Sequence, residues 1–208
     1  MNERKEWALV TGGASGIGKG IVERLVQDGH ECIVLDRNPP SCATPARWIA
    51  ADLADARSTA AALEEACKAA TITRLVNNVG TVRPAPIEEA TFADLEAVVA
   101  LNLRCALQCT QAVLPAMKAR GFGRVVNISS RSAMGRALRT VYAAIKSGLH
   151  GFTRTWALEL GRHGITVNAV APGPIETALF AAANPATSER TRHVMSRVPV
   201  GRIGKPED

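Results

Sequence analysis

A tyrosine and a lysine lie four residues apart in the segment Tyr142-Ala-Ala-Ile-Lys146. Within a helix this spacing places the phenol and the ammonium on one face. A free phenol titrates at about pH 10, and an adjacent cation in a partly desolvated cleft lowers that pKa, which suits proton transfer near neutral pH. Ser129 and Ser130 lie at the carboxyl end of a predicted strand, at the sheet edge where open α/β proteins bind ligands. The plainer interpretation of Tyr142 and Lys146 is a surface pair on an amphipathic helix.

A glycine cluster, Thr11-Gly-Gly-Ala-Ser-Gly-Ile-Gly18, stands between a predicted strand and a predicted helix. Glycines let the backbone turn tightly and let a pyrophosphate approach the helix N-terminus, whose free N–H groups favour an anion. Asp36 ends the second predicted strand, so the combination predicts dinucleotide binding. The Asp36 carboxylate favours NAD(H), because it can accept hydrogen bonds from the ribose hydroxyls and repels a 2′-phosphate. Arg37 beside it leaves NADP(H) open, and a plain turn residue is the alternative for Asp36.

Two further segments end predicted strands at the same edge. Asp52-Leu53 follows the third strand and can place a carboxylate near the adenine amino group. Asn77-Asn-Val-Gly80 ends the fourth strand, where the carboxyl edge of a parallel sheet meets its ligand.

Short β-branched runs alternate with helical periods along the chain, which predicts a Rossmann-like, doubly wound parallel sheet in a three-layer α/β/α arrangement. The predicted strands are 7–10, 31–36, 47–50, 72–77, 124–129 and 165–170, and the predicted helices are 17–28, 55–70, 92–118 and 140–160. The segment Lys205-Pro-Glu-Asp208 has the residues of a helix start. We therefore expect the C-terminal end to be truncated, with roughly 25–40 residues missing.

Composition limits the remaining possibilities. The chain has 208 residues, of which 47% are hydrophobic and 21% charged, typical of one globular domain. No secretory signal or membrane-spanning run is predicted, so we expect a cytoplasmic protein. The five cysteines are odd in number and lack metal-ligand spacing, so we predict neither disulfides nor a metal site.

The net charge of +6 is unevenly distributed. Residues 1–119 carry 12 basic and 14 acidic side chains, whereas 120–208 carry 13 basic and 5 acidic ones. Aromatic residues make up only 4% of the chain and no nucleic-acid motif is present, so we expect no nucleic-acid partner. The basic half indicates either a solvated face or a site for a phosphate-bearing or otherwise anionic ligand.

Taken together and in order, the segments TGGASGIG, NNVG, ISS, YAAIK and APGPIET, with Asn102, resemble those of the short-chain dehydrogenases/reductases over essentially the whole chain. The resemblance implies an NAD(P)-dependent oxidoreductase that transfers a hydride between nicotinamide and a carbonyl or secondary alcohol. The catalytic residues it implies are Asn102, Ser130, Tyr142 and Lys146. The expected cofactor contacts are Thr11, Gly12, Ser15, Gly16, Ile17, Gly18, Asp36, Arg37, Asp52, Leu53, Asn78, Val79, Gly80, Tyr142, Lys146, Pro172, Gly173, Ile175 and Thr177.

By that resemblance Tyr142 exchanges a proton with the substrate oxygen, Lys146 lowers its pKa and holds the nicotinamide ribose, and Ser130 hydrogen-bonds the carbonyl. Asn102 fixes a helix distortion and a water that connects Lys146 to solvent. Ser129 is the reserve for Ser130. Val79 stands where alanine is usual in the family, which adds bulk beside the cofactor.

The substrate is less constrained. Residues 177–202 are expected to form a mobile lid over the cleft within a single domain of residues 1–208. Basic residues lie between the catalytic serine and tyrosine and in the lid, namely Arg131, Arg136, Arg139, Arg190, Arg192, His193 and Arg197. They indicate an anionic or acyl-carrier-linked substrate, or simply solvated arginines.

The sequence resembles 3-oxoacyl-carrier-protein reductases, so a 3-oxoacyl thioester is the first candidate. Polyol, sugar and hydroxyacid dehydrogenases of the family, or a non-catalytic NAD-binding protein, are the alternatives. A homodimer or homotetramer is expected from the resemblance.

Overall fold

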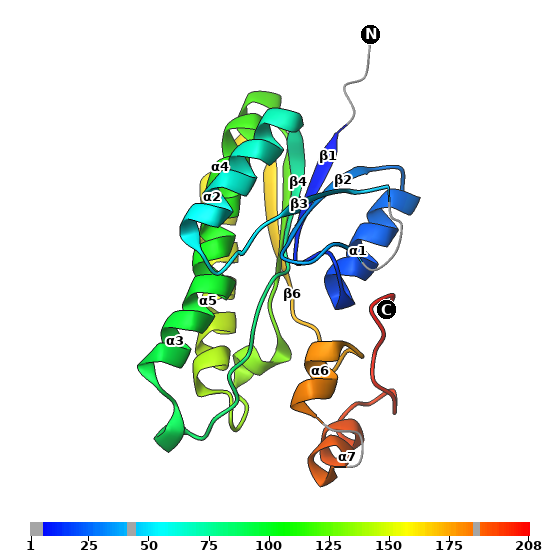
Figure 1. The fold of residues 1–208 in the computed structure, drawn as a ribbon, viewed down its shortest axis with the longest axis vertical. Coiled ribbons are helices and arrows are strands. Elements are labelled where there is room, and N and C mark those ends of the chain that lie inside the picture. The colour runs from blue at the N-terminus through cyan, green and yellow to red at the C-terminus, as the bar shows by residue number, and fades with distance from the viewer. Residues whose placement is uncertain (1–5, 41–44, 185–187) are drawn as a thin grey trace.

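The computed structural model describes residues 6–40, 45–184 and 188–208, apart from the side chains of Ala183 and Arg190. Cys42 and most of the charged N-terminal segment therefore lie outside the described residues. Six parallel strands form one sheet in the order β3-β2-β1-β4-β5-β6 (Figure 1). Their bounds are β1 Trp7–Thr11, β2 Glu31–Asp36, β3 Arg47–Ala50, β4 Ile72–Asn77, β5 Gly123–Ile128 and β6 Ile165–Val170. The order reverses between β1 and β4, which confirms the predicted doubly wound sheet.

Helices cover both faces of the sheet (Figure 1). On one face lie α2 (Ala56–Ala69), α4 (Cys105–Arg120) and α5 (Thr140–Leu160), and on the other lies α1 (Gly16–Gln27). The larger hydrophobic core joins the first group to the sheet through fully buried side chains such as Leu75. A smaller core packs α1 against β1 and β2. These layers confirm the three-layer arrangement.

The long helical region predicted over 92–118 is interrupted in the structure. It consists of α3 (Phe92–Val99), a π-helical turn η2 (Ala100–Arg104) and α4. Among the described residues, Phe92–Arg120 is the one helical run long and apolar enough to cross a membrane by length and composition. Here α4 packs against α2, β4 and β5, so its apolar face contributes to the core of the domain.

After β6 the chain forms two short helices, α6 (Ala178–Ala183) and α7 (Glu189–Ser196), which lie at the carboxyl end of the sheet (Figure 1). The predicted helix start at 205–208 is a turn instead. The Asp208 carboxylate accepts a hydrogen bond from the Lys205 N–H at 2.7 Å, as an acid does in the first turn of a helix. Gly204 pairs with Ile175 in an isolated bridge, which fastens this segment beside the loop that follows β6.

Candidate active site

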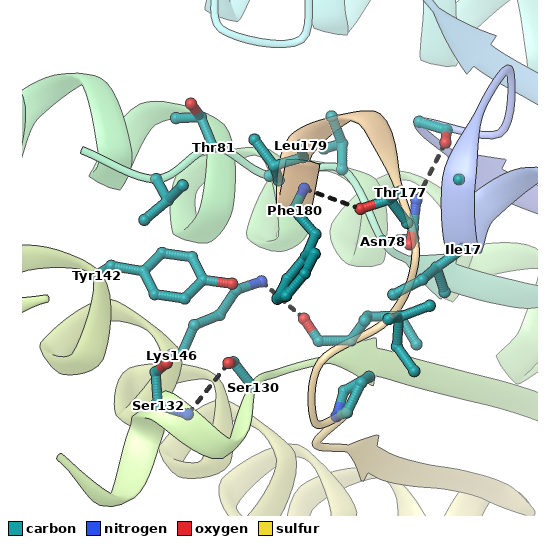
Figure 2. Close-up of a pocket in the computed structure, with 18 of the residues that line it drawn as sticks. Ile17, Asn78, Thr81, Ser130, Ser132, Tyr142, Lys146, Thr177, Leu179 and Phe180 are labelled. Atoms are coloured by element: carbon teal, nitrogen blue, oxygen red, sulfur yellow. Dashed lines mark hydrogen bonds between the residues drawn. The ribbon is translucent and has the colours of Figure 1, made fainter. Parts of the chain in front are cut away.

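One cavity of about 1200 Å³ runs along the carboxyl edge of the sheet. It begins beside the glycine loop and Asp36, passes the ends of β4 and β5, and reaches Tyr142 and the helices α6 and α7. Such a crevice at the point where strand order reverses is where open α/β sheets bind their ligands. Figure 2 shows Tyr142, Lys146 and Ser130 close together, with Phe180 beside them and Thr177 farther away, near Asn78 and Ile17.

The glycine loop between β1 and α1 is shaped for a phosphate-bearing group. Gly12 and Gly16 have φ angles of 67° and 54°, values that favour glycine. A Cβ at Gly18 would lie 2.1 Å from the Gly12 carbonyl oxygen, so the loop closes tightly on the helix. Ser15 is the N-cap residue of α1, but its side chain makes no capping hydrogen bond. It therefore does not compete with a ligand for the first N–H groups of the helix. The loop therefore fits a dinucleotide pyrophosphate at the helix N-terminus.

Thr11 and Asn78 hold this loop against the end of β4. Thr11 Oγ1 accepts hydrogen bonds from the N–H groups of Asn78 and Val79, at 3.0 and 3.1 Å. In return, Asn78 Nδ2 donates to the carbonyl oxygens of Thr11 and Gly12, at 2.9 and 3.1 Å. Thr11 and Gly18 do not line the cavity, and their contacts hold the loop in position. Asn78, Val79 and Gly80 do line it.

Two carboxylates mark the far end of the cavity. Asp36 accepts hydrogen bonds from the N–H groups of Ala14 and Asn38, both at 3.1 Å, which fixes its side chain at the end of β2. Asp52 accepts one from the Ala54 N–H at 2.9 Å. The remaining predicted contacts at this end that line the cavity are Gly12, Ser15, Gly16, Ile17, Arg37 and Leu53. The acids and the glycine loop thus face the same space.

The predicted catalytic side chains lie together on α5 and the end of β5. The side chain of Ser130 lies beside that of Tyr142 (Figure 2). Lys146 is 3% exposed, and its Nζ donates to the Ile128 carbonyl at 2.7 Å. Nζ lies 5.7 Å from the centre of the Tyr142 ring. Their spacing on one helix face therefore matches the prediction.

The pKa of Tyr142 differs from the expected direction. Burial raises the pKa of Tyr142, while the hydrogen bond from Ser130 and the charge of Arg139 act to lower it. Burial lowers the pKa of Lys146 to about 8. The expectation that Lys146 lowers the pKa of Tyr142 is thus not met, because the ammonium is itself desolvated and directed at the Ile128 carbonyl.

The structure also separates the two candidate serines. Ser129 is 3% exposed, and its hydroxyl donates to the Lys146 carbonyl at 2.9 Å and lies 2.8 Å from His150 Nε2. Ser130 instead lies beside Tyr142, and its hydroxyl oxygen accepts a hydrogen bond from the Ser132 N–H at 3.1 Å. Both serines line the cavity, but the Ser129 hydroxyl is already engaged by these two partners, which leaves Ser130 as the serine beside Tyr142.

Asn102 lies behind the cavity wall, in the π-helical turn η2. Its Nδ2 donates to the Val98 and Thr81 carbonyls, at 2.9 and 3.2 Å. Its Oδ1 is buried and has no hydrogen-bond partner within the described part of the chain. A Cβ at Gly80 would lie 2.5 Å from this oxygen and 3.5 Å from Lys146 Nζ. Glycine at position 80 therefore lets the amide and the ammonium approach the same point.

The loop after β6 closes the cavity. The predicted contacts Pro172, Gly173, Ile175 and Thr177 all line it. Thr177 Oγ1 accepts from the Phe180 N–H at 3.1 Å and so begins α6. Leu179 and Phe180 also line the cavity. They fall within the predicted lid of residues 177–202 but could not be singled out, because nothing in the local pattern shows that α6 turns toward Tyr142.

The basic side chains around the cavity differ in their exposure to solvent. Arg139 is 4% exposed and Arg136 is half-buried, whereas Arg131, His193 and Arg197 are exposed, and all five line the cavity. Arg192 does not line it, and the side chain of Arg190 lies outside the described part. No cluster of metal ligands occurs among the described residues.

Comparison with known proteins agrees with this site. The family model described as short chain dehydrogenase matches residues 6–188. The chain is 35% identical, over its whole length and 87% of the relative, to the (2S)-[(R)-hydroxy(phenyl)methyl]succinyl-CoA dehydrogenase subunit BbsD of Thauera aromatica. It is 34% identical, over its whole length and 88% of the relative, to a 3-oxoacyl-[acyl-carrier-protein] reductase of Vibrio harveyi.

A similar solved structure is that of a protein from Beutenbergia cavernae, described as an NAD(P)-dependent gluconate 5-dehydrogenase with bound NADP. It superposes with a TM-score of 0.92 at 33% identity, over 99% of this chain and 86% of that one. The family match, the relatives and the site agree, and the chain belongs to the short-chain dehydrogenase/reductase family of NAD(P)-dependent oxidoreductases.

Proposed function

We propose that this protein interconverts a carbonyl compound and its secondary alcohol, with Tyr142 as the group that exchanges the proton. The observation that carries this proposal is one continuous cavity, lined by the glycine loop at one end and by Tyr142, Ser130 and Lys146 at the other. A nicotinamide cofactor, when bound, supplies or accepts the hydride.

The residues of the chain supply position and electrostatics. Ser130 donates a hydrogen bond to the substrate oxygen while Tyr142 delivers or removes its proton. Lys146 holds the nicotinamide ribose. Asn102 binds, through its unpartnered Oδ1, a water that carries protons between Lys146 and solvent. A buried amide oxygen without a partner is costly, so a bound water at this point also satisfies it.

For the cofactor we propose a preference for NAD(H). The support is the Asp36 carboxylate at the end of β2, which lines the cavity and is fixed by two backbone N–H groups. A 2′-phosphate beside it would meet a like charge. The Beutenbergia cavernae protein holds NADP, so the preference needs a direct test.

We expect Asp36→Ser to raise the ratio of NADPH to NADH affinity about tenfold or more. Fluorescence titration of both cofactors measures it, and an unchanged ratio would contradict the proposal.

For the substrate we propose a 3-oxoacyl compound. The support is the similarity to the Vibrio harveyi reductase and the apolar side chains Leu138, Leu179 and Phe180 along the cavity wall. The acyl group can be presented as a thioester or as a free oxo acid. Polyols and sugars are the competing substrates, and oxidation of NADH and NADPH against ketones, oxo acids, thioesters and sugars tests the choice. Activity confined to polyols or sugars would overturn it.

A further inference from the structure

The substrate end of the cavity carries charge of one sign. Among the described residues that line it, the two acids are Asp36 and Asp52, which follow β2 and β3 at the other end. The lining residues elsewhere that carry a formal charge are Arg83, Arg131, Arg136, Arg139, Lys146 and Arg197. A cleft with walls of one charge in a low-dielectric medium concentrates ligands of the opposite charge.

Arg139 stands out in this group because it is 4% exposed. It occupies the N-cap position of α5, three residues before Tyr142, and both residues line the cavity. Its Nη1 donates to the Leu138 carbonyl at 3.0 Å, and its backbone pairs with Ala85 in an isolated bridge. The guanidinium is therefore held in place at the cavity wall.

Backbone strain accompanies this placement. Leu138 has a φ of 62°, a conformation that is uncommon for a bulky residue. Such strain collects at ligand-binding sites, where the surroundings fix the conformation. Here it presents the Leu138 carbonyl to the guanidinium and the Leu138 side chain to the cavity.

A guanidinium at this position is better placed to bind a carboxylate close to the reacting carbonyl than a phosphate far from that carbonyl. Its planar set of five N–H donors matches carboxylate geometry and stays charged at all ordinary pH values. Arg139 and Tyr142 line the same cavity at the start of α5, so an anion bound at Arg139 lies close to the carbonyl that reacts at Tyr142. The phosphates of coenzyme A or an acyl carrier are separated from the acyl carbonyl by the whole pantetheine chain.

We propose that the substrate is a free oxo acid, or the corresponding hydroxy acid, and that Arg139 binds its carboxylate. Arg136, half-buried on the same cavity wall, strengthens the local positive field. Leu138, Leu179 and Phe180 contact the carbon chain. This inference rests on the proposed oxidoreductase function and selects the free acid over the thioester as the form of the 3-oxoacyl compound.

Two matched substrate pairs test it. The first is 3-oxobutanoate against methyl 3-oxobutanoate, which differ in a carboxylate beside the reacting group. The second is acetoacetyl-CoA against the acetoacetyl thioester of N-acetylcysteamine, which differ in remote phosphates. We expect the wild-type protein to prefer the acid of the first pair in kcat/KM by about 10- to 100-fold, the effect of one charge-assisted hydrogen-bonded pair.

Variants assign that preference to Arg139. Arg139→Gln should remove the preference for the acid, chiefly by raising the KM for the acid. Arg139→Lys should retain part of the preference. Arg154→Gln, at an exposed position of α5 outside the cavity, is the control and should leave it unchanged. An acid-to-ester ratio near one in the wild type, a ratio that survives in Arg139→Gln, or a charge preference confined to the coenzyme A pair would each overturn the proposal.

A binding measurement separates this inference from the proposed function. Calorimetric titration of the protein with butanoate and with butanamide requires no turnover. We expect the wild type to bind butanoate about tenfold or more tightly than butanamide, with the difference lost in Arg139→Gln. If no carbonyl compound is turned over but this difference is found, the proposed function fails and the carboxylate site stands. If turnover is found without the difference, the carboxylate site fails. Should Arg139→Gln not fold, the wild-type ratios and Arg139→Lys still decide the question.

Discussion

At the level of single residues, the buried Lys146 of the candidate site makes the stability of the folded protein depend on pH. Burial lowers the pKa of Lys146 from 10.5 to about 8 in the folded protein. Between these values the unfolded chain holds a proton that the folded chain has released, so the free energy of unfolding rises with pH across this window. When the pH is raised from 8 to 10.5, the free energy of unfolding of the wild type should increase by up to about 3 kcal/mol relative to that of Lys146→Met.

Urea denaturation of both proteins at several pH values measures this gain. The difference between the two curves isolates Lys146, because the other groups that titrate in this range are shared. Parallel curves across the window would show that the folded protein does not disfavour the ammonium.

The candidate catalytic side chains could be predicted from the sequence, but their full surroundings could not. Tyr142 and Lys146 were placed on one helix face by spacing alone, and the structure confirms that face. The burial of Arg139 could not be predicted, because spacing along a helix does not show which loop packs over its first turn. The pKa of Tyr142 moved opposite to expectation for the same reason, since burial depends on tertiary packing.

At the level of elements, the connection from β1 to α1 depends on glycine at position 18. A Cβ there would lie 2.1 Å from the Gly12 carbonyl oxygen and 2.5 Å from Asn78 Nδ2. Gly18→Ala should therefore lower the free energy of unfolding by about 2–3 kcal/mol and weaken cofactor binding. Thermal or urea unfolding and cofactor titration measure both effects.

Gly161→Ala is the matched control for this change. A Cβ at Gly161 meets no heavy atom within 4 Å, and its φ of −55° suits any residue. It should alter stability by less than about 1 kcal/mol. Equal effects of the two substitutions would contradict the tight loop.

The sheet and its main helices were predictable because each strand carries a buried apolar run and each helix a clear period. Strands 31–36, 47–50, 72–77 and 165–170 match the structure at both ends. The π-helical turn at Asn102 was anticipated through the family resemblance, as a helix distortion, and not from the residue pattern. The short helices α6 and α7 were covered only by the predicted lid, because their apolar residues are too few for a period.

At the level of the whole molecule, we expect assembly through α4 and α5. Members of this family commonly form oligomers, and α5 exposes 86% of Leu158, an apolar side chain that a second copy would cover. Light scattering coupled to gel filtration should give two or four times the chain mass of 22.0 kDa. A single-chain mass at micromolar concentration would contradict this expectation.

The most direct test of the account is oxidation of NADH and NADPH against the substrate panel by the wild type and by Tyr142→Phe. We predict turnover of at least one carbonyl compound, reduced about 10²- to 10⁴-fold in the variant, the usual contribution of a positioned proton donor. Because Tyr142 is also an expected cofactor contact, cofactor affinity should fall in the variant, but by much less than turnover. Undiminished turnover in Tyr142→Phe, or cofactor binding without turnover of any substrate by the wild type, would contradict the central claim that Tyr142 performs proton transfer in this cavity.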